Sequence, residues 1–157
     1  MKDFKVNTNG LRNEIPLTQK QINKAVKYAI ELGMPREFIA YSVIYTTSYN
    51  EDYDILLVGT DLYPAKNVSN NTKTANSRVN WKSTIAHEII GHREAALKGK
   101  TQKNPIFEEA QASIRAARFT PGLNMTDRIT LLRDAVSRLP DGVKIKEIEN
   151  MLYITER

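Results

Sequence analysis

The chain has 157 residues, 41% of them hydrophobic and 26% charged, a composition typical of one soluble globular domain of about 100–200 residues. It contains no cysteine, so disulfide frameworks, cysteine-ligated zinc, iron–sulfur clusters and cysteine nucleophiles are excluded. The net charge of +5 comes from scattered Lys and Arg, so the charge leaves nucleic acid open as a partner without favouring it.

The predicted elements begin after a polar lead-in, residues 1–16, in which one short strand is expected at Phe4–Val6. The run that follows predicts a helix, because Thr18 and Gln21 fit a capping box and Gly33 fits the position that ends a helix. Its apolar residues recur at helical spacing on one face.

Two runs rich in β-branched and aromatic residues, 38–49 and 53–63, predict two strands joined by a polar turn. Within the second run, residues 55–58 are apolar without alternation, which indicates burial on both faces. Residues 65–77 are expected to form a polar loop, and residues 78–81 a short strand.

The second half of the chain predicts three helices. The first spans residues 83–98, and the second starts at Asn104-Pro105 and runs to about residue 119. The third opens at residue 126 or 127 and carries an apolar stripe. The stripe consists of Ile129, Leu132, Ala135, Val136 and Leu139. The tail from residue 143 fits a short strand or a short helix equally well.

This order of elements predicts an α+β fold in a single domain over residues 1–157. A small mixed or antiparallel sheet is expected to pack on the N-terminal helix and on the helix at 83–98, with further helices behind. No apolar run is long enough for a membrane span, and the start lacks the apolar core of a signal peptide. We therefore expect a cytoplasmic protein, or a domain delivered as part of a larger secreted protein.

The only two histidines of the chain, His87 and His92, lie together in the segment HEIIGH. In the zincin motif HExxH the histidines are four positions apart and face one ion. Here they are five apart, which is about 140° on a regular helix. They can share a metal only if the helix widens as a π-bulge. We predict this widening at Ile89–Gly91, where Gly91 can absorb the distortion.

The next helix offers a third metal ligand. Glu109 lies in its apolar stripe beside Ala110, whereas Glu108 lies about 160° round from Ala110, toward the outside. A carboxylate on a packing face is costly unless it is paired with a cation or bound to a metal. The competing interpretation is that Glu109 pairs with an arginine such as Arg93.

Two imidazoles and a carboxylate, with a fourth position open for water, form a standard catalytic zinc set. We therefore predict one Zn²⁺ per chain, bound by His87, His92 and Glu109, and no other cofactor. Zinc lowers the pKa of bound water to about 7 and polarises the scissile carbonyl. Glu88, directly after the first histidine, is predicted to be the general base.

Between residues 83 and 119, the pair HEIIGH and EEAQAS resembles the pair HELLGH and EECRAE of the dipeptidyl-peptidase III metallopeptidases. The resemblance implies a zincin-like fold, with both histidines and the second Glu of EE as zinc ligands and the Glu after the first His as base. The last Glu of EECRAE is Ser113 here, so the carboxylate that would orient a histidine is replaced by a hydroxyl or missing. Ser113 and Glu108 are the candidates to support the ligands.

The chain is also similar to small zincin-like domains at the C-terminal ends of bacterial polymorphic toxins of the Rhs type, in segments such as IAHEIIGHREA and EEAQASIRAARFTPGL. This resemblance implies a toxin or effector domain, with an immunity protein as its inhibitory partner.

The leading functional hypothesis is a zinc-dependent hydrolase that cleaves polypeptide, bound along an edge strand at residues 39–45 or 55–59. One alternative is a metal-dependent nuclease or nucleic-acid-targeting toxin, which the pI of about 9.4 permits. Such chemistry usually gathers several carboxylates around Mg²⁺. The other is a non-catalytic binding module. The donor that would stabilise the transition state stays open among Tyr41, Tyr45, Tyr49, Tyr53, Tyr63, Tyr153, Arg93 and Arg115.

Overall fold

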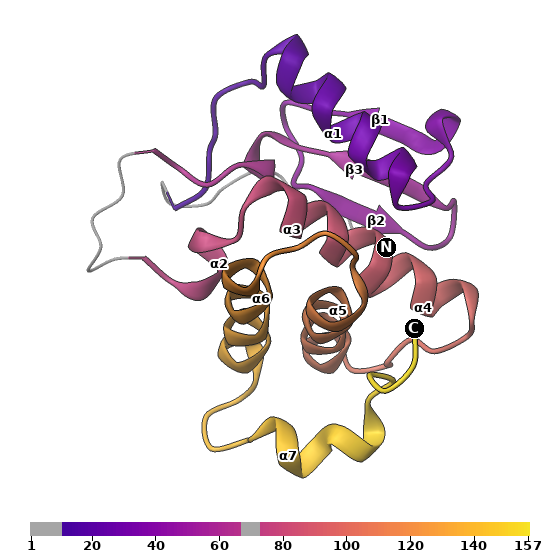
Figure 1. Cartoon of the computed structure of the whole chain (residues 1–157), viewed down its shortest axis with the longest axis vertical. Helices are drawn as coiled ribbons and strands as arrows, with labels where there is room; N and C mark the ends of the chain where they lie inside the picture. The colour runs from indigo at the N-terminus through magenta and orange to yellow at the C-terminus, as the bar shows by residue number, and fades with distance from the viewer. Residues whose placement is uncertain (1–10, 67–72) are drawn as a thin grey trace.

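The computed structural model describes residues 11–66 and 73–157. It confirms the α+β prediction: a small sheet lies at one end, and helices make up the rest of the molecule (Figure 1). The expected strand at Phe4–Val6 lies outside the described residues. In the part of the chain that is described, no helix is both long enough and apolar enough to cross a membrane.

The N-terminal helix α1, Gln19–Glu31, forms as the sequence predicts. Thr18 accepts a hydrogen bond from the backbone N–H of Gln21, and the Gln21 side chain accepts one from the backbone N–H of Thr18. This reciprocal pair satisfies two backbone donors that a helix start would otherwise leave free. Beyond the helix, a short 3₁₀ turn at Arg36–Phe38 leads into the sheet.

The sheet has the strand order β1-β3-β2, with β1 at Ile39–Tyr41, β2 at Ser48–Asn50 and β3 at Ile55–Val58. β1 pairs parallel with β3, and β2 pairs antiparallel with it. The prediction of one strand over residues 38–49 is therefore wrong. The chain leaves the sheet over residues 42–47 and returns at the opposite edge, because β3 can pair on both sides.

β3 is the central strand of this sheet, so the expectation that residues 55–59 form an edge is also wrong. Leu56 and Val58 are buried, whereas Ile55 and Leu57, which alternate with them, are only half-buried. The apolar run is thus covered fully on one face only. The two edges of the sheet are β1 and β2.

Local capping replaces the expected loop and strand before the histidine helix. Thr74 caps a short helix α2, Ala75–Arg78, and Asn80 caps α3, Trp81–Ala86. The predictions of a strand at 78–81 and of a helix start at residue 83 are therefore wrong. Side-chain oxygens at these two caps accept backbone N–H bonds, which outweighs the weak strand preference of the intervening residues.

α3 continues without a break into a π-helical segment, His87–Arg93, and then into α4, Glu94–Leu97. Two longer helices follow, α5 at Pro105–Phe119 and α6 at Met125–Arg138, and the tail forms a short helix α7 at Ile145–Ile148. α5 packs against both the π-helical segment and α6. The main hydrophobic core joins α1, β3 and α3, and a second cluster lies between α5, α6 and the tail.

The buried face of α6 differs from the apolar stripe that the sequence predicts. Leu131 and Asp134 face the interior, whereas Ile129 and Val136 remain 41% and 57% exposed. The stripe is wrong at these positions because a buried carboxylate occupies part of the packing face. That carboxylate belongs to the candidate site.

Candidate metal centre

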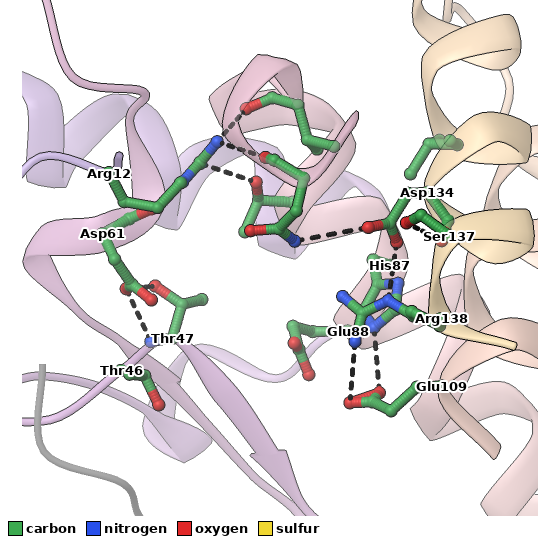
Figure 2. A pocket seen from close by; sticks show the side chains of 14 residues that line it. Arg12, Thr46, Thr47, Asp61, His87, Glu88, Glu109, Asp134, Ser137 and Arg138 are labelled. Carbon is green, nitrogen blue, oxygen red and sulfur yellow. Dashed lines mark hydrogen bonds and ion pairs between the residues drawn. The ribbon is translucent and has the colours of Figure 1, made fainter. Parts of the chain in front are cut away.

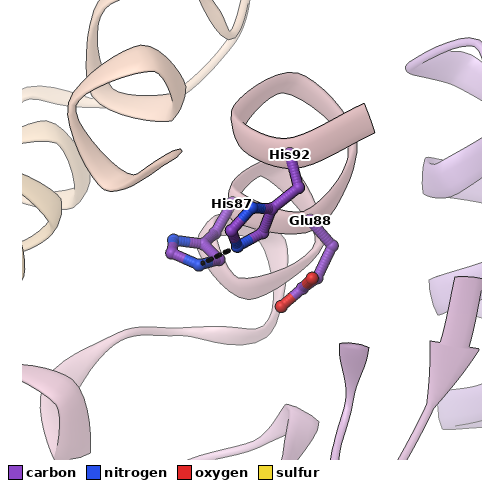
Figure 3. A group of neighbouring side chains, drawn as sticks. All are labelled: His87, Glu88 and His92. Carbon is purple, nitrogen blue, oxygen red and sulfur yellow. Dashed lines mark hydrogen bonds between the residues drawn. The ribbon is translucent and has the colours of Figure 1, made fainter. Parts of the chain in front are cut away.

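The predicted widening of the histidine helix is confirmed, since residues 87–93 form a π-helical segment. The wider turn places both imidazoles on one side of the helix (Figure 3). The Nε2 atoms of His87 and His92 are 3.1 Å apart, and the two rings meet edge to face with centroids 4.7 Å apart. Two imidazoles in this arrangement can bind one ion.

Gly91 allows α5 to approach this helix. A Cβ atom added at Gly91 would lie 2.4 Å from the backbone oxygen of Ala112 and 2.8 Å from its Cα. The expectation that Gly91 serves through its backbone freedom is incomplete, because the backbone of Ala112 fills the space that a Cβ atom at this position would occupy. This close contact holds α5, and with it Glu109, beside the histidines.

Glu109 completes a triangle of ligand atoms with the two histidines. Its Oε2 lies 3.3 Å from Nε2 of His87 and 2.7 Å from Nε2 of His92. Around a tetrahedral zinc with bonds of about 2.0–2.1 Å, ligand atoms are about 3.3 Å apart. Two edges of the triangle, 3.1 and 3.3 Å, are close to this spacing, and the third, 2.7 Å, is a hydrogen-bond distance that would have to lengthen around an ion.

Glu88 is a competing ligand, because its carboxylate lies within 4.8 Å of the ligand nitrogens of His87 and His92. We assign the third ligand position to Glu109, because its oxygen already lies at ligand-to-ligand distances from both nitrogens. With Glu109 as the third ligand, Glu88 would be free to act on a metal-bound water.

A chain of hydrogen bonds orients His87. Its Nδ1 lies 2.8 Å from Oγ of Ser113, and that hydroxyl donates to Oδ2 of Asp134 at 2.6 Å. A serine hydroxyl has one proton, so Ser113 must accept from the Nδ1–H of His87. This fixes the tautomer in which Nε2 of His87 carries the lone pair that a metal needs. Ser113, a predicted supporting residue, thus lies where it can support this ligand.

Glu108 orients the second histidine. Its Oε2 lies 2.6 Å from Nδ1 of His92, and its Oε1 accepts a hydrogen bond from the backbone N–H of Gln102. A carboxylate at Nδ1 again leaves Nε2 free for a metal. The expectation that Glu108 points outward is wrong, because its long side chain folds back from the first turn of α5 onto His92.

Asp134 belongs to the site but was not predicted. It is 2% exposed and also accepts a hydrogen bond from Nε of Arg138 at 2.8 Å. A signal for Asp134 is present in the sequence, because a carboxylate between the apolar residues Leu131 and Ala135 on the packing face of α6 needs a partner. It supplies the carboxylate that the Ser113 position itself lacks.

Burial and neighbouring charges shift the pKa values of His92, Glu109 and Glu88. Burial opposes charge on His92 and Glu109, but their 2.7 Å contact outweighs it, so the pKa of His92 is raised and that of Glu109 is lowered. Burial raises the pKa of Glu88 above its ordinary value. Arg93 binds Asp54 at 2.8 Å, so the choice of Arg93 in the competing interpretation is wrong. An arginine does adjoin Glu109, however, because Nη1 of Arg138 lies 4.0 Å from its Oε1.

Two cavities meet at the cluster. The first, about 420 Å³, is lined by His87 and Arg138 among others, and the second, about 470 Å³, by His92 and Tyr49. Both cavities reach Glu88 and Glu109, and Figure 2 shows the first of them. Of the open candidates for a transition-state donor, only Tyr49 lines either cavity, and its hydroxyl donates to Asp54.

Comparison of the chain with protein-family models, with curated proteins and with solved structures finds no match. The resemblance to dipeptidyl-peptidase III therefore rests on the two motifs alone. A proposal of function therefore rests on the geometry at His87, His92 and Glu109.

Replacing Asp134 with Asn should weaken zinc binding by about 10–100-fold, the usual effect of losing a partner that orients a metal ligand. The change removes the negative charge behind Ser113 while keeping the side-chain shape. Zinc affinity measured against a competing chelator checks this, with the exposed Asp141→Asn as the matched control. Equal zinc affinity in the Asp134 variant and the wild type would show that the hydrogen-bond chain does not orient His87.

Proposed function

We propose that this chain is a zinc-dependent metallopeptidase. The observation that carries the proposal is the triangle of Nε2, Nε2 and Oε2 atoms from His87, His92 and Glu109, with edges of 3.1, 3.3 and 2.7 Å. Both imidazoles have a partner at Nδ1, as ligand histidines do. Two imidazoles and one carboxylate suit zinc in an open four-coordinate site.

Glu88 is the general base of the proposed reaction. Zinc held by the three ligands would lower the pKa of a bound water to about 7 and polarise the carbonyl oxygen of the substrate. Glu88 is 8% exposed, lines both cavities and has its carboxylate within 4.8 Å of the histidine nitrogens, so it is close enough to take a proton from that water. Its raised pKa makes it a stronger base than an ordinary carboxylate. It accepts the proton of the water and passes it to the leaving nitrogen.

The shape of the site supports a polypeptide substrate. Cavities on both sides of the cluster leave room for chain before and after the scissile bond. β2 packs beside the π-helical segment and occupies an edge of the sheet, so an extended peptide can add to it by backbone hydrogen bonds. A role as a toxin domain inhibited by an immunity protein extends this proposal and rests on the motif resemblance.

Hydrolysis of internally quenched fluorogenic peptides by the purified chain tests the proposed function. We expect turnover that a chelator abolishes and that added zinc restores, because the three ligand side chains cannot activate water without the ion. His92→Ala should be inactive with or without zinc. If zinc-loaded protein cleaves none of a broad peptide set, or if its activity survives complete chelation, the proposal is wrong.

A further inference from the structure

The guanidinium of Arg138 lies beside the candidate metal centre, and the proposed ligand set does not use it. It lies at the end of α6 and lines the first cavity with His87, Glu88 and Glu109 (Figure 2). Its Nη1 is 4.0 Å from Oε1 of Glu109, the carboxylate oxygen that faces away from the two histidines. The side chain is 29% exposed, so the guanidinium is reachable from the cavity.

One edge of the Arg138 guanidinium is hydrogen-bonded, and the other edge can donate hydrogen bonds to a ligand. Its Nε donates to Asp134 at 2.8 Å, which fixes the plane of the group. Within residues 11–66 and 73–157, no acceptor lies within hydrogen-bonding distance of its two terminal nitrogens. Arg12 also lines this cavity, but its nitrogens donate to backbone carbonyl oxygens and serve to hold the chain.

We propose that Arg138 is a catalytic residue that donates hydrogen bonds to the oxyanion of the tetrahedral intermediate. This inference rests on the proposed metallopeptidase function. When the water oxygen bonds to the carbonyl carbon, the C=O π electrons move onto the carbonyl oxygen and a proton moves to Glu88. When the intermediate collapses, the C=O bond re-forms, the C–N bond breaks, and that proton goes to the leaving nitrogen. Arg138 stabilises the negative oxygen between these steps.

Two carboxylates place Arg138 beside the proposed ligands. Its Nη1 lies 4.0 Å from Oε1 of Glu109. Asp134 connects Arg138 to His87 through Ser113, so one buried carboxylate positions both a ligand and the donor before the substrate arrives.

Arg138→Met and Arg138→Lys test this role, with the exposed Arg133→Met of the same helix as control. We expect Arg138→Met to lower kcat by about 10²–10³-fold, the usual cost of losing an oxyanion donor, with KM and zinc content unchanged. Affinity for a phosphinic pseudopeptide, whose tetrahedral anion resembles the intermediate, should fall by the same factor as kcat/KM. Lys cannot both bond Asp134 and donate to the oxyanion in this geometry, so it should restore only part of the activity. Arg133→Met should behave as wild type.

Three results would overturn the assignment. Unchanged kcat and phosphinate affinity in Arg138→Met would show that Arg138 is not a donor. Loss of zinc would assign it to positioning Glu109. A rise in KM confined to substrates with a free C-terminal carboxylate would assign it to substrate recognition. In each case the active wild type leaves the metallopeptidase proposal intact. An inactive zinc-loaded wild type would instead reject the metallopeptidase proposal and the role of Arg138 with it.

Discussion

Replacing Glu88 with Gln should lower peptide hydrolysis by about 10²–10⁴-fold, the usual contribution of a positioned proton-transfer group, while zinc stays bound. The amide has nearly the shape of the carboxylate but cannot accept a proton from water. Glu88 lies beside the ligand triangle and not in it, so the metal keeps its three protein ligands. Steady-state kinetics on a fluorogenic peptide, together with metal analysis of the same sample, measure both effects.

Glu147→Gln is the matched control for this variant, because Glu147 is an exposed carboxylate that lines neither cavity. It should retain both activity and zinc. Full activity in Glu88→Gln would exclude Glu88 as the base. Loss of zinc from Glu88→Gln would show that Glu88 is a ligand. This is the main competing assignment, because the Glu88 carboxylate lies within 4.8 Å of the histidine nitrogens.

Replacing Gly91 with Ala should destabilise the protein and disrupt the metal centre together. The new Cβ would lie 2.4 Å from the backbone oxygen of Ala112, and backbone cannot move aside as a flexible side chain can. α5 must therefore shift away from the π-helical segment and take Glu109 with it. We expect the free energy of unfolding to fall by about 1–3 kcal/mol, typical of an overpacked core, and zinc affinity to fall as well.

Gly142→Ala separates this clash from ordinary backbone strain. Nothing lies within 4 Å of a Cβ added at Gly142, but its φ is +82°, so the substitution should cost about 1–2 kcal/mol by strain alone. It should leave zinc affinity unchanged. Chemical denaturation and a zinc titration of both variants give the comparison. A Gly91→Ala protein with wild-type zinc affinity would contradict the role assigned to the close contact.

Features set by neighbouring residues were predictable from the sequence. The capping box of Thr18 and Gln21 and the Pro-initiated helix α5 depend on hydrogen bonds and sterics within a few residues. The π-helical widening was predictable because only a change in residues per turn lets His87 and His92 face one ion. The choice of Glu109 rested on the cost of an unpaired carboxylate on a packing face. That premise is wrong, because the Glu109 side chain is 38% exposed and that of Glu108 only 17%.

Features set by tertiary contacts were not predictable in the same way. The strand expected at 38–49 splits because both edges of β3 are available, which local propensity does not encode. The position of Arg138 depends on Asp134 of its own helix and on α5 packing against α6. Glu108 reaches His92 through a side-chain conformation that a helical wheel, drawn from Cα positions, does not contain.

Zinc stoichiometry tests the central claim most directly. Purified protein, loaded with zinc and freed of excess metal, should contain about one zinc per chain, since we propose one set of three ligands among residues 11–66 and 73–157 for an open four-coordinate ion. His92→Ala and Glu109→Ala should contain little or none, whereas Glu88→Gln should match the wild type. A wild-type protein that takes up no zinc on titration, or that holds it equally well without His92 and Glu109, would contradict the metal centre described here.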